Sequence, residues 1–182
     1  SGDTFTVPSG ATLANLGTAT GFGGGVGTAD QWRLTTNFTG LAQPIASNLE
    51  QCDTAPNNSF PGSAMTESSG IFTFPSTGYW YVTLNHMYTS SDETGGPGTL
   101  SAIYATVNDS AYTKISQAYM GSRSNWGMSA YSSAIIDVTD TANVKVAFYA
   151  PDATSNTAAN ISTHGDTPEH KPYMTFLKLT DT

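Results

Sequence analysis

The sequence is poor in charged residues. Asp, Glu, Lys and Arg make up 11% of its 182 residues, whereas soluble domains usually carry about a quarter. Fourteen acidic against six basic residues leave a net charge of −8. An acidic chain gains nothing from the release of phosphate counterions, so the composition argues against a nucleic-acid partner. It also argues against binding to anionic membranes.

Cysteine and long apolar runs are scarce as well. Cys52 is the single cysteine, which excludes an intrachain disulfide and a cysteine zinc cluster. No residues around it are placed to activate a thiolate, so we expect an inert, partly buried thiol. No apolar run approaches the ~20 residues that a membrane-spanning helix needs. We therefore expect no membrane insertion.

The 3.6-residue apolar period of helices is missing too. β-branched and aromatic residues dominate the ordered stretches, and turn residues recur about every ten positions, which predicts an all-β sandwich or barrel. Irregular connections are expected at 43–62 and 152–171, and an exposed loop at 90–98. Strands are expected at 32–34, within 70–78, and at 79–88, 100–107, 111–120, 128–138, 144–150 and 173–179.

The stretch 79–88 carries bulky residues at both even and odd positions. Successive residues of a strand point to opposite faces, so this pattern predicts a central strand with one face in the core and the other against a partner. The residues predicted for the core or for trimer contacts are Phe72, Phe74, Trp80, Val82, Leu84, Val146, Phe148 and Phe176.

Residues 1–29 differ from the globular part, which we expect at 30–182. Phe5 and Val7 alternate with Thr, and a run of glycine occupies 23–25. One copy of this segment cannot bury its own apolar side chains, but three copies around an axis could. A flexible glycine-rich linker remains the alternative for 17–29. Because the chain opens with Ser1 and lacks a signal-like segment, we expect it to be a piece of a longer protein.

One motif points to a family. The stretch GIFTFPSTGYWYV at 70–82 resembles the G-x-F-x-x-P-x-x-G-x-Y-x-F motif of C1q/TNF-like globular heads, with Trp80 and Val82 in place of aromatic residues of the family. The stretches 135–148 and 174–179 resemble later strands of that family, although Thr141 or Ala142 replaces an expected glycine. This resemblance implies a homotrimeric, antiparallel jelly-roll sandwich over 30–182.

A second resemblance concerns the N-terminal segment. Residues 3–27, with TVPSGATL and GTATGFGG, resemble shaft sequences of marine and cyanobacterial phage tail fibres. Together the two resemblances imply a short β-rich shaft that enters a trimeric tip on the outside of a virion, on a tail or capsid fibre. They also imply further fibre or virion proteins upstream of Ser1.

No catalytic constellation can be found. His164, Asp166, Glu169 and His170 carry metal-binding groups, but their spacing fits no standard site, so a solvated loop is the preferred interpretation. The loop with Asp92 and Glu93 offers two carboxylates in sequence, fewer than calcium sites usually use. We therefore predict no metal, no cofactor and no enzymatic activity.

Recognition of a receptor needs only exposed aromatic residues and adaptable polar groups. Such residues surround the loop between Gly121 and Gly127, where Trp126 either binds a ligand or packs between subunits or under its own loop. The candidate receptor-binding residues are Tyr119, Arg123, Asn125, Trp126 and Tyr131.

The sequence thus predicts a structural fibre-tip protein that adheres to a host cell-surface glycan or protein. Three alternatives remain open. The first is a capsid decoration or head-fibre protein that only caps and trimerises, and the second is a bacterial surface adhesin of C1q-like type. The third, a glycan depolymerase, would need paired carboxylates in a groove.

Overall fold

The computed structural model describes residues 9–10, 26–91, 99–121, 125–152, 160–167 and 169–182. Most of the expected shaft segment 1–29 therefore lies outside the described residues. The described part contains no helix long and apolar enough to cross a bilayer. Its strands are β1 (Ala29–Leu34), β2 (Phe38–Thr39), β3 (Leu49–Gln51), β4 (Thr66–Ser68), β5 (Ile71–Thr73), β6 (Gly78–Ser90), β7 (Thr99–Thr106), β8 (Thr113–Met120), β9 (Gly127–Val138), β10 (Lys145–Tyr149), β11 (Ile161–Thr163) and β12 (Tyr173–Thr180).

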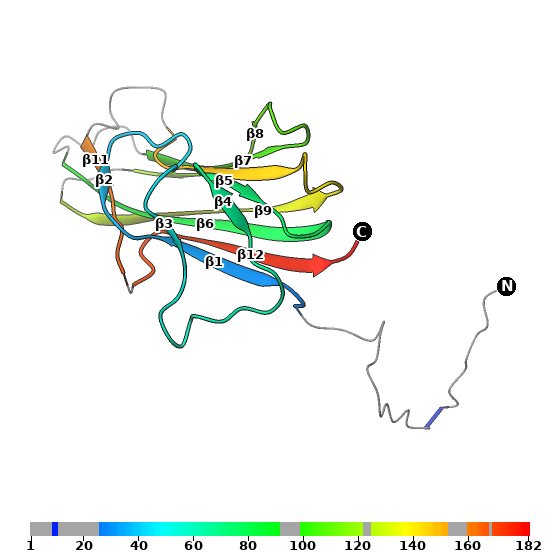
Figure 1. Ribbon diagram of the computed structural model, residues 1–182. Coiled ribbons are helices and arrows are strands. Elements are labelled where there is room, and N and C mark those ends of the chain that lie inside the picture. Colours follow the sequence, from blue (N-terminus) through cyan, green and yellow to red (C-terminus); the bar gives the residue numbers. More distant parts are fainter. Residues whose placement is uncertain (1–8, 11–25, 92–98, 122–124, 153–159, 168) are drawn as a thin grey trace.

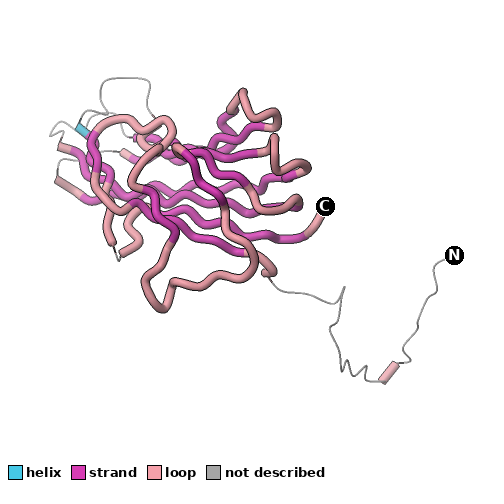
Figure 2. The backbone as a smooth tube through the Cα atoms, in the orientation of Figure 1, coloured by secondary structure: helices cyan, strands magenta, loops and turns pink. Residues whose placement is uncertain are grey.

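The strands form two antiparallel sheets, which Figures 1 and 2 show as two stacked layers. The first sheet has the order β2-β11-β6-β12-β1-β3, and β9 pairs with the other side of β6. The second sheet has the order β4-β5-β10-β7-β8. The predicted all-β sandwich is thus confirmed, with the 13-residue β6 as the longest strand of the described part.

The predicted central position of β6 follows from its pairing. β9 pairs with it from Gly78 to Thr89, while β12 and β11 share its opposite side. The side chains at its even positions, from Trp80 to Tyr88, are fully buried. The pairing of β6 on both of its edges and the alternation of its apolar residues therefore fix which face of β6 enters the core.

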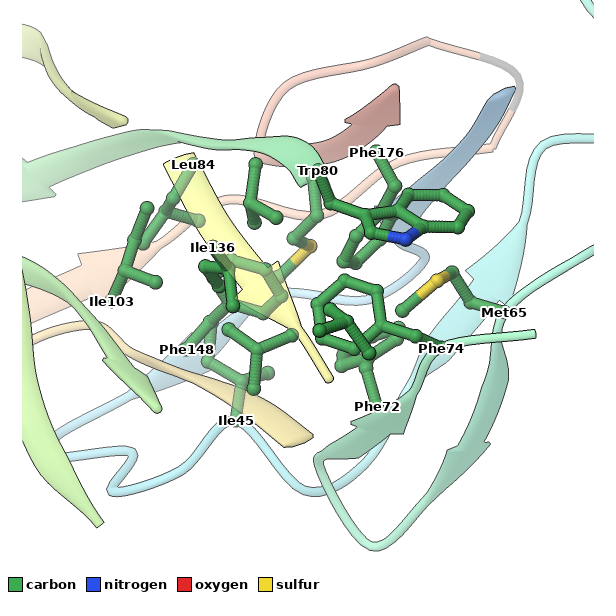
Figure 3. Packing of buried hydrophobic residues seen from close by; sticks show 14 of the residues in the cluster. Ile45, Met65, Phe72, Phe74, Trp80, Leu84, Ile103, Ile136, Phe148 and Phe176 are labelled. Carbon is green, nitrogen blue, oxygen red and sulfur yellow. The ribbon is translucent and has the colours of Figure 1, made fainter. Parts of the chain in front are cut away.

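Aromatic rings fill the space between the two sheets (Figure 3). The Phe72 ring lies 5.2 Å from the Phe176 ring and 5.4 Å from the Phe148 ring, while the Phe74 and Trp80 rings are 5.3 Å apart. The indole N–H of Trp80 donates to the Ser76 carbonyl. All eight residues predicted for the core or for trimer contacts are at most 1% exposed within the single chain.

Two short strands occur where the sequence predicted loops. β3 lies within the connection 43–62 and pairs only with β1, and β11 lies within 152–171 and bridges β6 to β2. Each has three residues, too few for an alternating pattern to be recognised. Pairing with neighbours distant in the chain, and not local propensity, creates these strands.

The two glycines of the 70–82 motif are required by its backbone. Gly70 has a φ of 82° and Gly78 a φ of 133°, values that L side chains rarely adopt. A Cβ on Gly78 would also lie 2.4 Å from the Thr180 carbonyl oxygen, and one on Gly70 would lie 2.4 Å from that of Ile45. The motif spacing thus marks two sharp turns at which the chain passes close to other backbone.

We predict that Gly78→Ala lowers the free energy of unfolding by about 1–3 kcal/mol or more, because it adds backbone strain and a steric clash. Gly121→Ala is the matched control, since a Cβ there contacts nothing within 4 Å. Denaturant unfolding of both variants measures the difference. Equal stabilities would contradict the assigned role of Gly78.

Candidate interaction surface

The outward face of the seven-stranded sheet is built by the odd positions of β6. In the strand register, Tyr81 lies between Leu177 of β12 and Ile135 of β9. Four residues further along β6, Asn85 lies between Tyr173 and Tyr131. We call this surface the tyrosine face; it comprises Tyr79, Tyr81, Asn85, Tyr131, Ile135, Tyr173 and Leu177.

The tyrosine face leaves large apolar groups in solvent. Ile135 is 63% exposed, Tyr131 53% and Tyr79 41%, and Leu179 beside them is 50% exposed. Adjacent exposed apolar side chains of this size on one sheet are characteristic of protein–protein contacts. Tyrosine is enriched in such contacts because it combines apolar area with a hydroxyl.

Charge is nearly missing from this surface. Among the described residues of β1, β6, β9 and β12, only Arg33 and Asp137 are charged residues whose register places them on this face. Arg33 is fully buried, and its guanidinium pairs with Glu50 at 2.9 Å and with Asp53 at 2.5 Å. A partner that covers the tyrosine face therefore has to desolvate few charges.

Hydroxyl groups organise the centre of the face. The hydroxyls of Tyr81 and Tyr131 lie 2.9 Å apart, and the Ser129 hydroxyl donates to the Asn85 side-chain oxygen. The hydrogen bond with Tyr81 raises the pKa of Tyr131, and hydrogen bonds with Ser133 and Tyr131 lower the pKa of Tyr81. Either tyrosine hydroxyl can be the donor, and the bond joins β6 and β9 through their side chains.

A second apolar region adjoins the face at the edge of its sheet. In the described part, β9 pairs only with β6, so its other edge is unpaired, although β7 and β8 come within 8 Å of β9, Cα to Cα. A groove of ≈ 400 Å³ runs along that edge, lined by β9 residues and by Val107 and Ile115. Val107 is 77% exposed. Ile135 belongs both to this groove and to the tyrosine face.

Four of the five predicted receptor-binding residues lie in the described part, on or beside β8 and β9. Tyr119, near the end of β8, and Trp126, just before β9, are 63% and 58% exposed. Asn125 between them donates its backbone N–H to the Ser90 carbonyl. Arg123 lies outside the described residues. Tyr131 lies in the tyrosine face, about 13 Å along β9 from Gly127 at the rise of a β-strand.

The two glycines that flank this segment have ordinary backbone conformations. Neither Gly121 nor Gly127 has a φ in the left-handed region, and a Cβ on Gly127 would meet only Met87, at 3.8 Å. Asn125 adopts the left-handed conformation instead, with a φ of 58°. Asparagine is tolerated there better than most residues.

The potential metal-binding groups of the loop 164–170 contact other side chains of the protein. Lys171 pairs with Asp166 at 2.5 Å and with Glu169 at 3.5 Å, and the hydrogen bond from Lys171 lowers the pKa of Asp166. His170 lies 3.2 Å from the side-chain nitrogen of Asn57. No group of three metal-binding side chains occurs among the described residues. Asp92 and Glu93 lie outside them.

Cys52 is buried, and burial raises the pKa of its thiol to about 11. At neutral pH such a thiol carries almost no thiolate, the form that reacts. The burial and the raised pKa of Cys52 agree with the expectation of an inert thiol.

His86 is the one imidazole on the core side of β6. It is fully buried, stacks on Tyr88 at 5.1 Å and shares a 2.9 Å hydrogen bond with the Thr163 hydroxyl. Burial lowers the pKa of His86 to about 3, with a smaller contribution from His164. The folded chain therefore holds this ring neutral at all but strongly acidic pH.

We predict that His86 makes the fold sensitive to acid. Its unfolded pKa is about 6.5, so its contribution is complete above pH 6.5 and is lost as the pH falls toward 3. The slope reaches about 1.4 kcal/mol per pH unit, because only the unfolded chain takes up the proton. Denaturant unfolding between pH 7 and 4 should show a shallower slope for His86→Gln than for the unaltered chain. Parallel curves would contradict the assignment.

Comparison with known proteins rests on structure alone. No family model matches the chain, and no curated protein matches it in sequence. Among solved structures, Eiger TNF from S. frugiperda has a TM-score of 0.59 at 17% identity, over 85% of this chain and 93% of that chain. Murine APRIL has a TM-score of 0.56 at 10% identity, over 84% and 98%.

The globular domain of zebrafish complement 1qA protein is also similar. It has a TM-score of 0.52 at 10% identity and covers 85% of this chain and 98% of its own. The strand orders of the two sheets and these likenesses agree with the resemblance of the 70–82 motif. The chain therefore has an antiparallel jelly-roll fold of the C1q/TNF-like type.

Proposed function

We propose that the chain forms the homotrimeric head of an extracellular fibre, which recognises a glycan or protein on a host cell. The observation that carries the proposal is the tyrosine face, a nearly uncharged surface with several exposed apolar side chains on an otherwise acidic protein. An acidic chain stays soluble and monomeric through its charge, so a charge-poor apolar surface favours contact with further copies of the chain.

A threefold ring needs two different contact surfaces on each copy, since its interfaces are heterologous. The tyrosine face provides one, and the groove along the unpaired edge of β9, with Val107 and Ile115, provides the other. Because Ile135 is shared by both, the two surfaces meet at one edge of the sheet. This geometry supports a closed ring around an axis near β9, and the C1q/TNF resemblance implies the number three.

The fibre context rests on the N-terminal segment. The resemblance of residues 3–27 to phage fibre shafts supports a place on a virion tail or capsid fibre and further fibre proteins upstream. A head that presents three equal sites gains avidity, so that a weak single site suffices for adhesion. Two alternatives share the trimer: a capsid decoration or head-fibre protein that only caps and binds no ligand, and a bacterial surface adhesin that is not part of a virion.

Recognition is assigned to the segment between β8 and β9. Tyr119 and Trp126 are well exposed, and neither belongs to the tyrosine face. A trimer built as proposed leaves this segment at the end of the sandwich where β6 also ends, since Gly127 pairs with Thr89. Aromatic rings and amide groups together suit sugars as well as protein surfaces.

We predict that Ile135→Asp dissociates the trimer, because it introduces a charge into both contact surfaces at once. The matched control is Leu41→Asp, which changes an equally apolar, 49% exposed residue outside these surfaces. Sedimentation velocity at micromolar concentration should give three chain masses for the control and one for Ile135→Asp. Circular dichroism checks that both variants are folded. A folded Ile135→Asp trimer would refute the proposed interface.

We predict that Trp126→Ala leaves the melting temperature and the trimer mass unchanged but weakens adsorption to host cells and signals on a glycan array. The reason is that an exposed side chain contributes to contacts with a ligand and little to packing. Leu41→Ala serves as the control for a neutral change on the surface. Lost stability with normal adsorption would assign Trp126 to packing between subunits.

A further inference from the structure

Three buried polar atoms between the two sheets have no hydrogen-bond partner among the described residues. They are Nδ1 of His86 and the hydroxyl oxygens of Ser101 and Ser132. All three residues are at most 3% exposed. Buried polar groups are nearly always paired, because each lost its bonds to water when the chain folded.

Two of these atoms share one region of the core face of the first sheet. His86 pairs with Ala130 across β6 and β9, and Leu84 pairs with Ser132. Since alternate residues of a strand share a face, His86 and Ser132 are diagonal neighbours on the core side. Such neighbours lie about 7–8 Å apart at their Cα atoms, a distance that one small bridging molecule can span between side chains.

The third atom approaches from the second sheet. Ser101 lies two residues before the buried Ile103 in β7 and therefore shares its core-facing side. Ile103 lies near Leu84 in the core (Figure 3), and β7 comes within 8 Å, Cα to Cα, of both β6 and β9. Ser101 thus belongs to the same end of the interior as His86.

The side chains around His86 differ in size. Its direct partner across β9 is Ala130, two of the polar groups nearby come from serine, and the buried ring of Tyr88 stacks on His86. Nε2 of His86 is already engaged by the Thr163 hydroxyl, so only Nδ1 needs a partner. Unsatisfied hydrogen-bonding groups, both donor and acceptor, therefore occur together here.

We propose that this region binds one buried water molecule, which bridges Nδ1 of His86 and the hydroxyls of Ser101 and Ser132. Water both donates and accepts, and three hydrogen bonds are the usual number for an internal water. The molecule links the two sheets beside Tyr88, whose hydroxyl donates to the backbone carbonyl of Met120 at the end of β8. It is a structural ligand of the jelly roll and is independent of the tyrosine face.

Alanine substitution separates a hydrated site from a dry one. With the water present, Ser132→Ala removes one of its three partners, and the melting temperature should fall by several degrees. In a dry core, the same change removes a hydroxyl that had no partner, and the melting temperature should stay constant or rise. Ser101→Ala should behave in the same way. Ser68→Ala, an exposed serine of β4, is the control.

A crystal structure of the full chain at a resolution that orders internal waters tests the site directly. The expected result is one water peak within about 3.2 Å of all three atoms. Direct bonding of His86 Nδ1 to a protein group, or a closed contact without a peak, would overturn the proposal even if Ser132→Ala is destabilised.

Discussion

The two-faced packing of β6 is the constraint on which the remaining structure depends. Its even side chains form the floor of the core, and pairing with β9, β12 and β11 holds them there. Because the side-chain period of a strand is two, burial of Trp80 fixes the outward direction of Tyr79 and Tyr81. One register therefore creates both the core and the tyrosine face, and a slip by one residue would destroy both.

Much of this arrangement could be predicted from local pattern. The bulk on both sides of 79–88 indicated a central strand, and the glycines at 70 and 78 marked turns that the backbone requires. The expected burial of Phe72 and Phe176 followed from alternation and from the C1q/TNF resemblance. These features depend on residues that are close together in the sequence, so a sequence pattern can indicate them.

Other features have no local trace. β3 and β11 exist because distant strands pair with them, and Arg33 is buried only because Glu50 and Asp53 come to it from another segment. Tyr131 was grouped with Trp126 because they are close in sequence, although a strand carries them apart. The His86 region was not predictable either, since its neighbours come from three strands.

Charge and surface chemistry connect the fold to assembly. The chain is acidic overall, yet the tyrosine face is nearly neutral, and the proposed trimer rests on this difference, since charge repels copies of the chain in other orientations. The mass of the unaltered full chain in solution, measured by light scattering during a dilution series, tests this account most directly. The account predicts three times the chain mass of 19.1 kDa down to micromolar concentration. A folded species of one chain mass at that concentration would contradict it.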